Sequence, residues 1–211
     1  MSPKVLLLIG TKKGGFIFES DAQRWEWRLR EPVCASWPVY HFTADPERGA
    51  LYAAAGSEWY GAAVWRSLDL GKTWSHSSEG LNYGQSGPDI KTVWSVAPSD
   101  GLVYAGVEPA GLFVSEDKGA TWQHVSGLRG HPSCPGWMPG GGGLCLHSIV
   151  PHPTDPRQVW VAISSAGTFH TADGGATWTA QNGGVRADFM PEKYPEVGQC
   201  VHNLQIAPSR P

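Results

Sequence analysis

Three histidines and one tryptophan recur at one position of a repeat in this chain of 211 residues. His41, Trp94, His147 and His202 follow one another at steps of 53, 53 and 55 residues, each in a short apolar segment that closes on a proline. Such segments are typical of strands, so the side chains are expected at matching places on four strands. Converging neutral imidazoles are metal ligands. The three histidines therefore predict a metal centre whose fourth corner, at Trp94, stays open for water or substrate.

Two cysteines extend this hypothesis. Cys145 and Cys200 each stand two residues before a histidine of the set, which places thiol and imidazole on the same strand face. Sulfur and nitrogen ligands together suit zinc, copper or iron. Two structural alternatives remain open: the histidines hydrogen-bond across the channel between the strands, or the two cysteines pair as a disulfide.

Two glutamates supply candidates for proton transfer. Glu58 and Glu108 each follow a strand at its turn, where Lys12 and Ser165 hold the corresponding places in the other units. On the enzyme hypothesis one of them is the general acid or base, or orients the imidazoles through their second nitrogen. The alternative is that both only cap turns or pair with Lys12.

Two long insertions, residues 126–143 and 183–198, directly precede the Cys-x-His segments. Long irregular loops in compact domains are often functional, so these are expected to overhang the same mouth. Aromatic and charged residues there and on the strands are the candidate substrate-binding set: Trp59, Trp94, Trp137, Arg186, Asp188 and Tyr194.

The elements that must position these residues are indicated by a second repeat. Residues 67–74, 115–122 and 171–178 all read Ser/Thr-x-Asp-x-Gly-x-Thr-Trp, and residues 19–25 form a degraded copy. In this motif Asp can bond its own turn, Gly can adopt positive φ and Trp can pack into the core. Asp69, Asp117 and Asp173 are therefore interpreted as structural rather than catalytic.

The spacing of the motifs predicts the architecture. Their tryptophans lie 49, 48 and 56 residues apart, which suits a four-stranded propeller blade of about 40–50 residues. The motif resembles the Asp-box, or BNR, repeat of sialidase-like and sortilin-like β-propellers. That resemblance implies an all-β propeller of four-stranded antiparallel blades. Sialidases of this kind carry an Arg-Ile-Pro motif and three substrate-binding arginines, and neither can be assembled here, so sialidase activity is not expected.

One domain, residues 1–211, is expected to hold four blades. Three units span 37–80, 90–127 and 144–182, and the fourth joins residues 4–30 to an inner strand at 199–208. This joining of the two ends would close the ring and remove free sheet edges. The alternative is a partial ring that pairs with a second copy in a homodimer.

Composition limits the partners. The formal net charge is -3 and basic residues are not clustered, which argues against nucleic acid as a partner. The apolar run at residues 5–9 is too short to span a membrane, so no membrane association and a cytoplasmic location are expected. The leading hypothesis is a metal-dependent hydrolase or oxidase acting on a small molecule or glycan. The alternatives are a noncatalytic propeller that binds a peptide or carbohydrate, and a metal-free glycoside hydrolase that uses Glu58 and Glu108.

Overall fold

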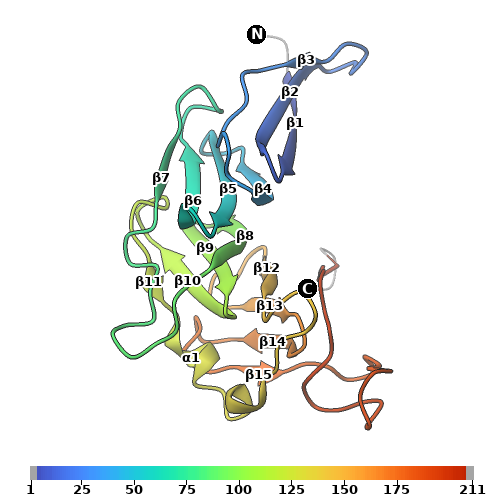
Figure 1. Cartoon of the computed structure of the whole chain (residues 1–211). Coiled ribbons are helices and arrows are strands. Elements are labelled where there is room, and N and C mark those ends of the chain that lie inside the picture. Colours follow the sequence, from blue (N-terminus) through green and yellow to red (C-terminus); the bar gives the residue numbers. More distant parts are fainter. Residues whose placement is uncertain (1–3, 208–211) are drawn as a thin grey trace.

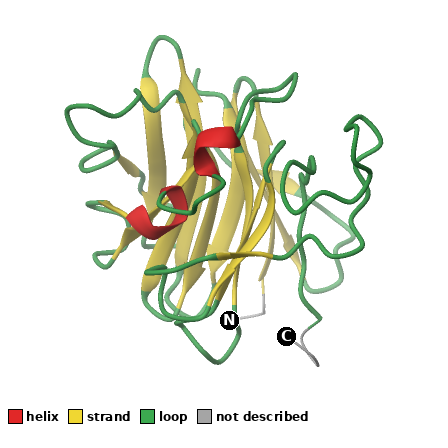
Figure 2. Cartoon of the chain, turned by 90° about the horizontal axis from the view of Figure 1, so that it is seen from below, coloured by secondary structure: helices red, strands yellow, loops and turns green. Residues whose placement is uncertain are grey.

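Four antiparallel sheets follow one another in an arc (Figure 1) in the computed structural model of the chain, which describes residues 4–207. The first described sheet has the order β1-β2-β3, and the next three are β4-β5-β6-β7, β8-β9-β10-β11 and β12-β13-β14-β15. Their strands run side by side through the centre, with loops gathered around them (Figure 2). Each sheet is one blade, and the predicted all-β propeller architecture is confirmed.

The strands keep sequence order within every blade. Blade one contains β1 (Lys4–Thr11), β2 (Gly14–Asp21) and β3 (Arg28–Leu29), and blade two contains β4 (Val39–Asp45), β5 (Ala50–Ser57), β6 (Gly61–Ser67) and β7 (Ser75–Ser77). Blade three contains β8 (Thr92–Ser99), β9 (Leu102–Glu108), β10 (Gly111–Ser115) and β11 (Gln123–His124). Blade four contains β12 (Leu146–Pro151), β13 (Val159–Ile163), β14 (Gly167–Thr171) and β15 (Thr179–Ala180).

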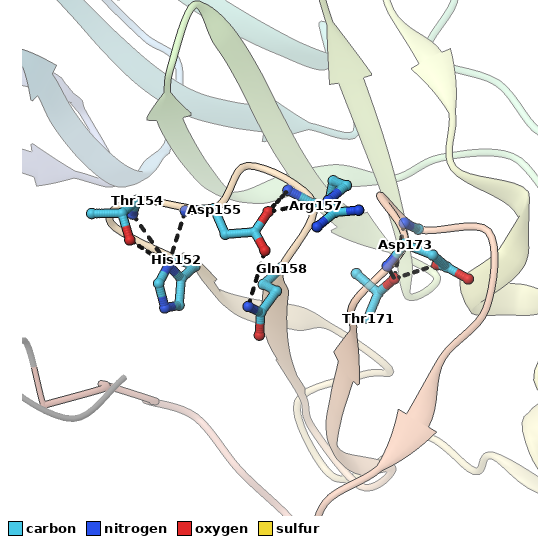
Figure 3. A network of polar contacts seen from close by, with 8 residues as sticks. His152, Thr154, Asp155, Arg157, Gln158, Thr171 and Asp173 are labelled. Carbon is cyan, nitrogen blue, oxygen red and sulfur yellow. Dashed lines mark hydrogen bonds and ion pairs between the residues drawn. The ribbon is translucent and has the colours of Figure 1, made fainter.

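The repeated Asp motif forms the turn between the third and fourth strands of a blade. In blade three the Asp117 carboxylate accepts hydrogen bonds from Ser115 Oγ at 2.7 Å, from the Ala120 and Thr121 amides at 2.9 Å, and from Thr121 Oγ1 at 2.7 Å. Lys118 and Gly119 both adopt positive φ there, 62° and 81°. The bond between Thr171 and Asp173 repeats the arrangement in blade four (Figure 3). These aspartates are structural, as their positions in the motif indicate.

The core lies between neighbouring blades and depends on small residues in the second strands. Ala53, Ala54 and Ala55 of β5 are fully buried. A Cβ atom added at Gly106 of β9 would lie 2.5 Å from Leu146 Cδ2 and 2.8 Å from Leu146 O. Only glycine allows β9 to approach β12 this closely.

Closure of the ring is not confirmed. Residues 199–206 form no ladder with β1, and Pro208 lies outside the described residues. The segment instead lies along blade four, where Ser148 Oγ donates to His202 O at 3.3 Å and accepts from the Leu204 amide at 3.2 Å. In Figure 1 this segment, in red, rises beside blade four, and blade one stands above it at the top of the view. Pairing with a second copy stays a prediction.

The insertion before β12 contains a short α-helix, α1 (Ser126–Arg129), and a 3-10 turn, η1 (Cys134–Gly136). Leu128 of α1 is fully buried in the core formed by blades three and four. Within residues 4–207, no helix combines the length and the apolar character that crossing a bilayer requires.

Candidate functional site

Each complete blade has an irregularity at the same place in its innermost strand. The ladder to the second strand shifts between Val39 and His41 in β4, between Val93 and Ser95 in β8, and between Leu146 and Ser148 in β12. A β-bulge leaves one residue unpaired and redirects its side chain. The bulged residues are Tyr40, Trp94 and His147.

These side chains and His202 form one continuous row of rings, which we call the aromatic row. Ring centroids of Tyr40 and Trp94 are 4.4 Å apart, and those of Trp94 and His147 are 5.0 Å apart in an edge-on arrangement. His147 and His202 stack at 4.6 Å with an interplanar angle of 19°. The row therefore runs from blade two across blades three and four to the C-terminal segment. Tyr40 and His202 are exposed, and the two central rings are half-buried.

His41 is not a member of the row, contrary to its predicted equivalence with Trp94. It pairs with Ala54 just beyond the bulge, and its Nδ1 accepts a hydrogen bond from the Val96 amide at 3.3 Å. Tyr40 takes the expected place. The sequence signal was the apolar residue before each row member, Val39, Val93, Leu146 and Val201. The closing proline is a poorer guide, because it follows Tyr40 by six residues but Trp94 by four.

Glu108 is fixed beside the centre of the row. Its Oε2 accepts hydrogen bonds from Trp94 Nε1 at 3.1 Å and from Cys145 Sγ at 3.5 Å, and its Oε1 lies 3.5 Å from Lys91 Nζ. The side chain is 14% exposed. The carboxylate thus has a defined orientation at the edge of the rings.

Glu58 does not occupy the equivalent place. Ala54 pairs with the residue after the bulge in blade two, as Gly106 does in blade three. Two residues after Ala54 the chain has Gly56, whereas two residues after Gly106 it has Glu108. The β5–β6 hairpin is longer than the β9–β10 hairpin, so Glu58 lies beyond this level in an exposed turn. Both glutamates begin a three-residue turn, after the pairs Ser57–Gly61 and Val107–Gly111, so they match at the turn but stand at different levels relative to the bulge.

The surroundings of His147 favour the neutral form of its ring. Burial lowers its pKa, the nearby His202 lowers it further, and Glu108 raises it in part. Beside it opens a groove with a cavity of about 270 Å³, lined by His41, Ser95, His147, Asn203 and Gln205 among others. The groove continues from the row along the innermost strands.

The loop residues predicted to bind substrate are scattered. Trp137 is 7% exposed and packs on Phe169 at 5.0 Å, which places it in the core of blade four instead of on a pocket wall. Arg186 and Asp188 pair with each other at 2.8 Å on the surface. Trp59 is 90% exposed at the tip of its turn, and Tyr194 is also exposed. Of the predicted substrate-binding set, only Trp94 belongs to the row.

The predicted metal ligands are only partly brought together. Among residues 4–207, no three side chains of His, Cys, Asp or Glu are grouped so that they could hold a metal ion. His147 and His202 present ring faces to each other, and Cys145 donates to Glu108 and to Gly142 O. None of these residues is therefore assigned as a metal ligand, and metal binding remains a prediction.

The two thiols beside the row differ sharply. Cys145 is buried, and burial together with the charge of Glu108 raises its pKa to about 12. Cys200 is exposed, and its Sγ lies 3.1 Å from His202 Nε2 and 3.5 Å from Ser164 Oγ. Both cysteines are free thiols, so the structure does not contain the disulfide that the sequence left open.

Comparison with known proteins gives a fold but no family. No protein-family model and no curated protein matches the chain. Among solved structures, the GH74 xyloglucanase from Xanthomonas campestris superposes with a TM-score of 0.57 at 22% identity, covering 84% of this chain and 28% of its own. The GH74 enzyme from Niastella koreensis gives 0.54 at 18% identity, covering 83% and 28%. YCF48 from Cyanidioschyzon merolae gives 0.45 at 16% identity, covering 84% and 56%.

The chain thus spans little more than a quarter of the length of the two GH74 structures. At these identities the likeness concerns the backbone alone. Together with the four antiparallel sheets, it establishes that this chain has a β-propeller fold.

Proposed function

We propose that the chain is a carbohydrate-binding propeller segment whose aromatic row receives a glycan. The observation that carries the proposal is the continuity of the row across three units, Tyr40 to Trp94 to His147 to His202. Exposed aromatic rings pack against the apolar parts of sugars, and a few fixed polar groups beside them set orientation. A linear series of rings suits an extended ligand better than a compact one.

Glu108 supplies the fixed polar group. Its carboxylate is held by Trp94 and Cys145, so it can accept hydrogen bonds from sugar hydroxyls without first losing much side-chain entropy. The groove beside His147 adds Ser95, Asn203 and Gln205 as further donors and acceptors. Two of the structural neighbours are described as GH74 enzymes, one of them as a xyloglucanase, which supports a glycan as ligand and suggests the first probe.

Hydrolysis of a glycan requires more catalytic groups than binding alone. Glu108 is the carboxylate at the row and would be the acid or base, but a glycosidase needs a second carboxylate about 5–10 Å away. Glu58 stands beyond the level of Glu108 in an exposed turn. Binding is therefore proposed first, and the resemblance to sialidase-like Asp-box propellers adds no catalytic residue to it.

The test is binding of xyloglucan oligosaccharides and of a printed glycan array, followed by calorimetry on the best ligand. Trp94→Ala removes one of the two central rings and is expected to weaken binding about tenfold, about 1.4 kcal/mol. Trp25→Ala is the matched control, because Trp25 is 86% exposed in the turn between β2 and β3. Absence of any glycan ligand, or equal affinities of the two variants, would refute the proposal.

A further inference from the structure

The C-terminal segment, residues 199–206, lies where the innermost strand of a further blade would lie. Between the innermost strands of blades three and four, Ser95 Oγ donates to Leu146 O at 2.8 Å. Ser148 Oγ, at the equivalent position of blade four, donates to His202 O of the segment at 3.3 Å. No strand among residues 4–207 forms a ladder with the segment, however. It is therefore an innermost strand without a second strand beside it.

Blade one has the opposite deficiency, because its strand β1 matches the second strands of the other blades. A Cβ atom added at Gly10 of β1 would lie 2.7 Å from Val39 O. At Gly106 of β9, the second strand of blade three, it would lie 2.8 Å from Leu146 O. Val39 and Leu146 both directly precede a row member of the adjoining blade. Within the described part of the chain, β2 is the one strand that pairs with β1, so the innermost strand is missing here.

Blade one also leaves an apolar face open. Leu7 and Ile9 of β1 are 46% and 36% exposed. In the alignment given by the two glycines, they correspond to Val103 and Ala105 of β9, which are buried in the core shared with blade two. A face that packs against a neighbouring blade elsewhere in the molecule is thus exposed in blade one, and exposed apolar surface of this kind marks an interaction site.

We propose that the open edge of β1 receives residues 199–206 of a second copy of this chain, so that two copies complete each other's blade. The occupant is a second copy because the chain carries both halves, which do not pair with each other within one copy. Two-fold symmetry would form the contact twice and would remove the free edge of β1. The proposal is independent of glycan binding.

The ladder of blade three sets the register of the shared blade. There the residue after the row member pairs with the glycine of the second strand. The same register places Leu204 opposite Ile9 of the second copy. Ile206 then lies opposite Leu7, two residues further along the ladder. Residues directly opposite each other in an antiparallel pair share a face, so the apolar residues of the segment would cover the apolar residues that β1 exposes.

The experiment mixes Leu7→Cys with Ile206→Cys under mild oxidation, both in the full chain with Cys200→Ser. Opposite residues of an antiparallel pair lie about 4.5–5.5 Å apart at Cα, within reach of a disulfide. We expect a covalent dimer of two 22.7 kDa chains on a nonreducing gel, with the bond between residues 7 and 206 located by peptide mapping. Leu68→Cys is the matched control, since Leu68 is 47% exposed in the Asp motif of blade two, and should not couple to Ile206→Cys.

Gel filtration with light scattering measures the mass of the unchanged protein, which should be that of two chains. Leu7→Asp places a charge opposite Ile206 and should raise the dissociation constant by about tenfold or more, whereas Leu68→Asp should leave it unchanged. A single-chain mass at every concentration, a mass above two chains, or equal coupling of Leu7→Cys and Leu68→Cys would overturn the proposal. A disulfide within one chain of the double variant Leu7→Cys/Ile206→Cys would also overturn it, in favour of closure within the monomer.

Discussion

Replacing Asp117 by alanine tests whether the Asp motif holds a blade together. The change removes an acceptor of four hydrogen bonds, from Ser115 Oγ, the Ala120 and Thr121 amides, and Thr121 Oγ1. A hydrogen bond contributes about 0.5–1.5 kcal/mol net, and we take about 0.5 because Asp117 is exposed and water can substitute. The expected loss is then about 2 kcal/mol in the free energy of unfolding.

Urea unfolding at neutral pH, followed by tryptophan fluorescence, measures this loss. With a slope of about 2 kcal/mol per molar urea, the midpoint should fall by about 1 M. Glu116→Ala is the matched control, since Glu116 is the exposed residue next to Asp117 and a surface change of this kind stays within about 0.5 kcal/mol. Equal midpoints for the two variants would refute the structural role of the motif.

The same pair of proteins gives a pH dependence of known sign. Burial raises the pKa of Asp117, but hydrogen bonds from Thr121, Ser115 and Ala120 lower it to about 2 overall. A carboxyl whose pKa is lower in the folded state stabilises that state above its unfolded pKa of about 4. The stability difference between the unchanged protein and Asp117→Ala should therefore be constant above about pH 5 and shrink as the pH falls toward 2. A difference that grew on acidification would contradict the argument.

Two further changes test the blade contact and the metal hypothesis. Gly106→Ala forces a Cβ atom against Leu146 and should lower the free energy of unfolding by about 1–3 kcal/mol. Its melting temperature should be lower than that of Gly141→Ala, where an added Cβ meets nothing within 4 Å. Equal melting temperatures would show that the contact between the blades does not require glycine at this position. The metal hypothesis predicts near-stoichiometric zinc, copper or iron in elemental analysis of the purified protein, lost in His147→Ala, and protein free of metal after reconstitution would end it.

The fold could be predicted from sequence because its determinants are local. The Asp motif encodes its own turn through bonds within five residues, as between Asp69 and the Thr73 amide at 2.9 Å. Repetition of that turn at blade spacing then specifies the architecture. Ring closure could not be predicted in the same way, since it depends on where the segment after Gln199 packs, and Ser148 competes for it.

The site was only half predictable for related reasons. The number of residues between the row member and the closing proline differs between blades, six after Tyr40 and four after Trp94, so His41 replaced Tyr40 in the expected set. The longer β5–β6 hairpin likewise made Glu58 look equivalent to Glu108. Trp137 lies in a glycine-rich loop, yet it is buried, because burial depends on a partner distant in sequence, Phe169.

If the aromatic row binds a ligand as proposed, the three bulges also separate recognition from folding. A bulged residue lies outside the inward and outward alternation of its strand, so its side chain can change while the paired residues on either side keep their contacts. The chain itself illustrates this freedom, with tyrosine, tryptophan and histidine at Tyr40, Trp94 and His147. Ligand preference could thus be altered blade by blade, through one codon each, on a scaffold that stays constant.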